Sequence, residues 1–186
     1  MRRPVVALGF AALVATLSAF AADSTTHRYP LPGHGSFALD VPADWTNELR
    51  QPEGGQPPTI VLTQSSGSRF RVLITPMFQD IFVLEPPDAE MLHQHVEALA
   101  AGAAEHATQK KLALHEIKGA AGVGYYFTAE LSSPEPDGFK YLTRGMLGVD
   151  KLVVKFIVLS DEGHAKIVDR VLAMLKGARH LQSAKP

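Results

Sequence analysis

Residues 152–159 place the strongest constraint on what this chain can fold into. The run reads Leu-Val-Val-Lys-Phe-Ile-Val-Leu and is apolar at every position except Lys155. Successive side chains of a strand point to opposite faces, so a strand that is apolar on both faces has to be covered on both. We therefore expect this run to be the central strand of a sheet.

Period-two patterns elsewhere in the chain predict further strands. In residues 35–41 the side chains of Phe37, Leu39 and Val41 fall on one face, which is typical of a half-buried strand. Short links rich in turn-forming residues separate several of the remaining candidates, and such links favour antiparallel neighbours. The other predicted strands are residues 59–64, 69–75, 112–117, 123–131 and 139–147.

Two amphipathic stretches predict helices. Asp88 can cap a helix over residues 89–107, whose apolar side chains recur at intervals of three and four. Ser160 or Asp161 can cap a second helix that ends near Lys176. This order of elements predicts an α+β fold, in which an antiparallel sheet of six to seven strands is flanked by two main helices. The result is an α/β/α-type sandwich with the helices on opposite faces.

The N-terminal residues have the pattern of a secretory signal. A basic start precedes an apolar stretch that ends at Ala19-Phe20-Ala21, and the small residues Ala19 and Ala21 suit cleavage after Ala21. A membrane anchor is the alternative, but the apolar core is short for a bilayer span. We expect a periplasmic or secreted protein, divided into a signal peptide at 1–21, an extended lead-in at 22–34, one α+β domain at 35–180 and a tail at 181–186.

The composition limits both the chemistry and the partners. The chain has no cysteine, so disulfides, thiolate zinc sites, iron–sulfur clusters and cysteine nucleophiles are excluded. Its 18 basic and 19 acidic residues nearly balance. Without a basic excess we expect neither nucleic-acid binding nor strong attachment to anionic lipid. We also expect no membrane insertion once the signal peptide has been removed.

The order of the elements resembles that of the PsbP-like family, which includes DcrB-like proteins. The resemblance rests on residues 37–45, Phe-Ala-Leu-Asp-Val-Pro-Ala-Asp-Trp, on residues 124–127, Gly-Tyr-Tyr-Phe, and on the final strand and helix. It covers most of the chain beyond the leader. The resemblance implies an α+β sandwich and a non-catalytic accessory or binding protein, and it transfers no functional residue to this chain.

No pattern in the sequence assembles a catalytic or metal site. His93 and His95 are two residues apart, so a regular helix points them in different directions and they cannot share one ion. Residues 65–68, Ser-Ser-Gly-Ser, fit a hairpin turn and lack the glycine-flanked elbow of serine hydrolases. We therefore predict no catalytic residue, no metal and no cofactor.

Basic side chains on two predicted strands are candidates for an anion-binding surface. Arg69 and Arg71 fall on one face of their strand, and Lys140 and Arg144 alternate in the same way on theirs. If the two strands lie close together, the four cations gather on one surface. The alternative is a solvated face whose side-chain stems cover apolar neighbours.

Residues 77–87 are more apolar than a connection between a strand and a helix requires. Exposed apolar patches commonly mark interfaces, whereas an extra edge strand or a loop folded onto the sandwich would also cover such residues. We keep both interpretations open. The candidate partner-binding residues are Phe78, Ile81, Phe82, Val83 and Leu84.

These patterns predict an exported, non-catalytic accessory or binding protein of the cell envelope that engages another envelope or secreted protein. A small-ligand carrier that uses the space between sheet and helix is an alternative, and so is a hydrolase with an unrecognised site. An enclosed apolar cavity would favour the carrier. A histidine, a serine and a carboxylate converging in one cleft would favour the hydrolase.

Overall fold

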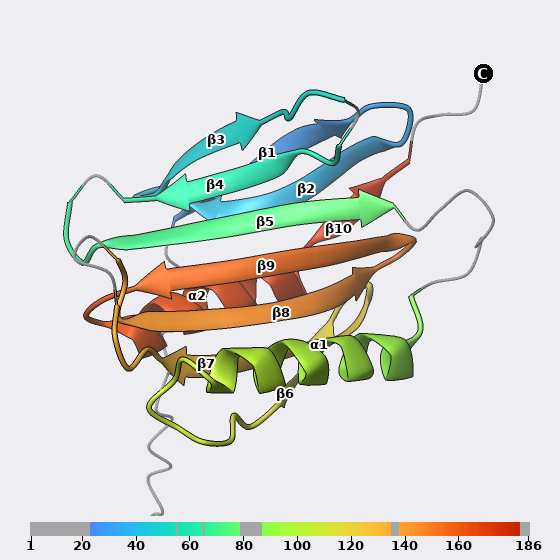
Figure 1. Ribbon diagram of the computed structural model, residues 1–186. Helices are drawn as coiled ribbons and strands as arrows, with labels where there is room; N and C mark the ends of the chain where they lie inside the picture. Colours follow the sequence, from blue (N-terminus) through green and yellow to red (C-terminus); the bar gives the residue numbers. More distant parts are fainter. Residues whose placement is uncertain (1–22, 55, 65, 79–86, 135–137, 183–186) are drawn as a thin grey trace, which may run out of the picture.

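A seven-stranded antiparallel sheet organises the chain (Figure 1). The computed structural model describes residues 23–54, 56–64, 66–78, 87–134 and 138–182. The order of strands across the sheet is β3-β4-β5-β9-β8-β7-β6. These strands are β3 (Thr46–Arg50), β4 (Thr59–Thr63), β5 (Phe70–Phe78), β6 (His115–Gly119), β7 (Gly122–Glu130), β8 (Tyr141–Val149) and β9 (Leu152–Ser160).

Strand β9 lies in the middle of this sheet, as its apolar sequence predicts. It pairs along its whole length with β5 on one side and with β8 on the other. The side chains of Val154, Phe156 and Val158 are at most 1 % exposed, whereas Ile157 is only half-buried and Lys155 is exposed. The central position is therefore confirmed, but the cover that we expected on the second face is incomplete.

One face of the sheet is covered by a helix and by a second, smaller sheet. Helix α2 (His164–Lys176) and the three strands of the small sheet lie behind the large sheet in Figure 1. Phe37, Leu39 and Val171 are buried in one core that the two sheets and α2 share. The small sheet is antiparallel and has the order β1-β2-β10, with β1 (Ser24–Leu31), β2 (Gly35–Pro42) and β10 (Arg179–Leu181).

The opposite face of the large sheet carries helix α1 (Ala89–Ala104) over only part of its width. Leu92, Val96 and Ala100 of α1 pack into a second core with Phe127 of β7 and Met146 of β8. Figure 1 shows α1 in front of the lower strands, while no described helix lies in front of β9, β5 and β4. The two helices therefore lie on opposite faces, as predicted.

The edges of the fold differ from the sequence expectation. Residues 22–34 were expected as an extended lead-in, but they contain β1, which pairs with β2 from Ser24 opposite Pro42 to Leu31 opposite Gly35. The strand predicted at 35–41 therefore belongs to the small sheet. Strand β3, whose residues are mostly exposed and polar, takes the edge position of the large sheet instead.

The second helix begins later than the sequence suggested. Ser160 is the last residue of β9, and the Asp161 carboxylate accepts a hydrogen bond from Nε of Arg69 at 2.6 Å, so neither residue caps the helix. Gly163 precedes α2 with a φ of 70°, which lies in the left-handed region that glycine favours. The turn after β9 is therefore made by glycine rather than by a polar cap.

Candidate binding surface

The part of the sheet that α1 leaves uncovered is an apolar strip bordered by cations. We call it the open half-face. Its residues belong to β4, β5, β9 and β8 and lie on the α1 side of the sheet, because residues that pair across neighbouring strands share a face. They are Leu73, Leu142, Ile157, Leu159, Arg71, Arg144 and Lys155, together with Val61, which is itself buried.

Paired residues build the open half-face in rows. In one row Leu73 of β5 is opposite Ile157 of β9, which is opposite Arg144 of β8. In the next row Arg71 is opposite Leu159. Leu73, Ile157 and Leu159 are each half-buried, so apolar surface remains in contact with solvent along the centre of the strip.

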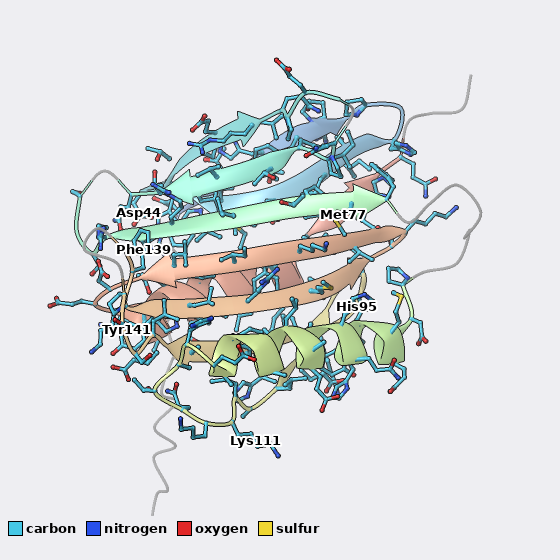
Figure 2. The ribbon with its side chains drawn as sticks, viewed as in Figure 1. Asp44, Met77, His95, Lys111, Phe139 and Tyr141 are labelled. Carbon is cyan, nitrogen blue, oxygen red and sulfur yellow. The ribbon has the colours of Figure 1, made fainter. Side chains whose placement is uncertain are left out.

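A groove of about 270 Å³ runs between this strip and α1. Leu99 of α1 and Met77 of β5 line it, and Figure 2 shows Met77 on the side of the sheet that α1 covers only in part. The hydroxyls of Thr59 and Thr75 are 2.8 Å apart in its wall. The groove is open to solvent, so it offers a surface to a partner rather than a closed chamber to a small ligand.

Positive charge is left unbalanced on the open half-face. No described carboxylate forms an ion pair with any of its three cations. The carboxylates at its borders already have other cationic partners: Glu48 pairs with Arg50 at 3.2 Å, and Asp161 pairs with Arg69 at 2.6 Å. The hydrogen bond from Arg69 lowers the pKa of Asp161, so this carboxylate is ionised and committed to its arginine.

The four cations predicted as an anion surface fall into two groups. Arg71 and Arg144 lie on the open half-face, on either side of β9. Arg69 is held by its carboxylate partner and lies over the Phe139 ring, 4.5 Å from the ring centroid. Lys140 Nζ pairs with a glutamate of β7 at 3.0 Å. The structure thus brings two of the four onto one surface, and anion binding by them stays a prediction.

Sequence reasoning missed part of this surface. Lys155 was noted only as the interruption of an apolar strand, although a charge in the middle of such a run is a signal that one face of the strand reaches solvent. Leu73 and Ile157 gave no signal, because their exposure depends on how far α1 extends across the sheet. That extent is a property of helix packing and not of the strand sequences.

The predicted partner-binding residues lie at the end of β5 and beyond it. The Phe78 ring stacks on the His34 ring with centroids 3.6 Å apart, and Phe78 is partly buried against the larger core. This contact gives Phe78 a packing role. Ile81, Phe82, Val83 and Leu84 lie outside the described residues, so their binding role stays a prediction.

A serine and a histidine do meet on the other side of the sheet. Oγ of Ser160 is 2.5 Å from Nδ1 of His164, and Oγ1 of Thr143 is 3.0 Å from Nε2 of the same ring. The Thr143 hydroxyl is in turn 2.6 Å from that of Thr128. Ser160 is fully buried and both imidazole nitrogens are engaged by hydroxyls, so no described carboxylate orients the ring for catalysis.

This hydroxyl network holds the start of α2 against the sheet. Tyr141 stacks on the His164 ring, with centroids 5.0 Å apart. Burial lowers the pKa of His164, because a charged imidazolium loses hydration there. His164 is therefore neutral at pH 7, when one ring nitrogen donates a hydrogen bond and the other accepts one.

Histidines on α1 take part in packing rather than in a metal site. Nδ1 of His95 is 3.1 Å from the backbone oxygen of Met91, and the His93 ring meets Tyr125 edge-on with centroids 4.9 Å apart. Within the described residues, no three or more histidine, aspartate or glutamate side chains gather as metal ligands. Neither described helix combines the length and apolar character that crossing a bilayer needs.

Comparison with known proteins gives a likeness of fold. No protein-family model matches the chain, and no curated protein matches it. A similar solved structure is the solution structure of cyanobacterial PsbP (CyanoP) from Synechocystis sp. PCC 6803, at 13 % identity and a TM-score of 0.48, over 94 % of this chain and 99 % of that one. At this identity the similarity is a weak resemblance of fold to a PsbP protein, and it assigns no activity or partner to this chain.

Proposed function

We propose that this chain is an exported, non-catalytic binding protein that engages a protein partner through the open half-face. One observation carries the proposal: α2 and the small sheet cover one face of the large sheet, whereas α1 covers only half of the other. The remainder presents half-buried leucine and isoleucine side chains and three cations without carboxylate partners. Exposed apolar surface of this kind on a folded domain marks interaction sites.

The alternatives receive less support from the described residues. A carrier needs an enclosed apolar cavity, but the groove beside α1 is open. A hydrolase needs a nucleophile that a substrate can reach, but the hydroxyl beside His164 belongs to a fully buried serine. The leader sequence supports an envelope or secreted location and therefore a partner in the same compartment.

Charge reversal on the open half-face tests the proposed function. The tagged full-length chain is expressed in its source cells, and envelope proteins are captured on it. Arg71→Glu/Lys155→Glu should abolish capture of the partner. Lys151→Glu/Lys166→Glu changes the net charge equally at exposed positions outside the open half-face and should leave capture unchanged. Equal capture by both double variants would contradict the proposal.

A further inference from the structure

We propose that the partner presents an acidic amphipathic helix to the open half-face, and that this helix lies beside α1 over β9 and β5. The inference rests on the proposed function and names the chemistry of the partner. It follows from the space next to α1, from the arrangement of apolar and basic groups in that space, and from the height of α1 above the sheet.

The spacing of the strands leaves room for one helix. Helix α1 lies over β7 and β8, and the next pair of strands across the sheet is β9 and β5. Strands are about 4.8 Å apart, so a helix centred over that pair would lie about 10 Å from α1. Helices that pack against each other have axes about 8–10 Å apart. A second helix would therefore meet both the sheet and the flank of α1 at ordinary distances.

The side chains in this space match an amphipathic helix. Leu73, Ile157 and Leu159 form an apolar floor, and Leu99 adds an apolar wall from α1. A helix that buries a stripe of residues at i, i+3 and i+4 would cover this floor. Apolar contacts of this kind supply the affinity, because association is driven by surface removed from water.

The cations border the apolar floor on which that helix would lie. Arg71 is on β5 at one side of the floor, and Arg144 is on β8 at the other. Lys155 lies on β9 two residues before Ile157. The rows that contain the three cations span four residues of β9, or about 13 Å, which is about two and a half turns of helix. Glutamate or aspartate side chains on both borders of the apolar stripe would complement them.

A lipid surface fits this site less well than a helix does. The axis of α1 stands about 10 Å above the sheet, so the apolar floor is recessed beside it. A flat bilayer that rests on α1 would not reach Leu73 or Ile157. A partner strand is also disfavoured, because strand addition needs a free edge and the groove lies on a face.

A designed peptide tests the inference with purified components. The probe has 16 residues, the length of α1, with leucines in one stripe, glutamates on both borders and a lactam bridge on its outward face to hold the helix. A control peptide has the same composition and bridge but a scrambled order that removes the stripe. Binding to the purified mature chain is measured by calorimetry.

We expect the striped peptide to bind at least tenfold more tightly than the scrambled one. Arg71→Glu/Lys155→Glu should weaken this binding at least tenfold, whereas Lys151→Glu/Lys166→Glu should change it less than twofold. A peptide with lysine in place of every glutamate should bind Arg71→Glu/Lys155→Glu better than the unaltered chain. Circular dichroism of both double variants should match that of the unaltered chain, which checks that the fold is intact.

Four results would overturn the inference. Equal binding of the striped and scrambled peptides would show that the surface does not recognise an amphipathic helix. Equal binding of the striped peptide by both double variants would show that the binding site lies outside the open half-face. Phosphatidylglycerol vesicles that bind in place of the peptide, with the same dependence on Arg71 and Lys155, would make a membrane the occupant. If envelope capture depends on the open half-face while the helical peptide does not bind, the inference fails and the proposed function stands.

Discussion

The half-buried imidazole of His164 makes the stability of this fold depend on pH. In the unfolded chain the ring takes up a proton at a pKa of about 6.5, whereas burial lowers its pKa in the folded chain. Between these two values the unfolded state binds more protons, so the free energy of unfolding decreases as the pH falls. Above the unfolded value both states are neutral and this contribution is constant.

Urea unfolding of the unaltered chain and of His164→Gln at several pH values measures this effect. The unaltered chain should lose stability as the pH falls below about 6.5, until the folded pKa is reached. His164→Gln should show a smaller loss over the same range, whatever its stability at pH 7. An identical pH dependence of the two proteins would show that the ring is not buried in a neutral state.

Two glycines provide a matched test of packing at the residue scale. A Cβ atom at Gly145 would lie 2.5 Å from the backbone oxygen of Tyr125 and 2.5 Å from the Phe156 ring, so Gly145→Ala should cost about 1–3 kcal/mol or more. At Gly102 of α1 a Cβ would meet nothing within 4 Å, and Gly102→Ala should stabilise by about 0.5–1 kcal/mol. Urea unfolding measures both changes in stability. A Gly145→Ala variant as stable as the unaltered chain would contradict the close approach of β7, β8 and β9.

At the scale of elements, the N-terminus of α1 depends on one side chain. The Asp88 carboxylate accepts a hydrogen bond from the backbone N–H of Glu90 at 3.1 Å, as its position before the helix predicts. Asp88→Ala should lower the free energy of unfolding by about 1 kcal/mol. Asp88→Asn should lower it much less, because an asparagine side chain can accept the same hydrogen bond. Equal losses in the two variants would mean that the cap contributes little and that the charge matters instead.

Strands could be predicted from the sequence where the pattern of apolar residues indicates which faces of the strand are buried. Residues 152–159 are apolar on both faces, and this placed β9 at the centre of the sheet. Strands β1 and β3 could not be recognised in the same way, because edge strands are paired on one side only and carry many exposed polar residues. Strand β10 was missed as well, because its three residues pair with β2, which is far away in the sequence.

The candidate site could be predicted only in part for a related reason. Alternation showed that Arg71 and Arg144 each leave the apolar face of their strand. Sequence could not show that β5 and β8 both pair with β9, nor that Arg69 and Lys140 would be neutralised by carboxylates on other elements. The open half-face arises from the width of the sheet relative to one helix, and no short stretch of sequence encodes that ratio.

At the scale of the whole molecule, the predicted signal peptide would decide which partners the chain can meet. Cleavage after Ala19-Phe20-Ala21 would give a mature N-terminus at Ala22. Intact mass or N-terminal sequencing of protein from the envelope fraction should find this terminus. Retention of Met1 in a membrane pellet would show that the leader is an anchor, and partners would then be limited to those near the membrane surface.

The central claim is that the open half-face, rather than the opposite face, touches the partner. Site-specific photocrosslinking in intact source cells tests this directly. A photoreactive phenylalanine at Leu73, on the open half-face, should give a discrete adduct with another protein. The same residue at Ala173, exposed on α2 on the other side of the sheet, should give none. Adducts from Ala173 alone, or from neither position, would contradict the claim.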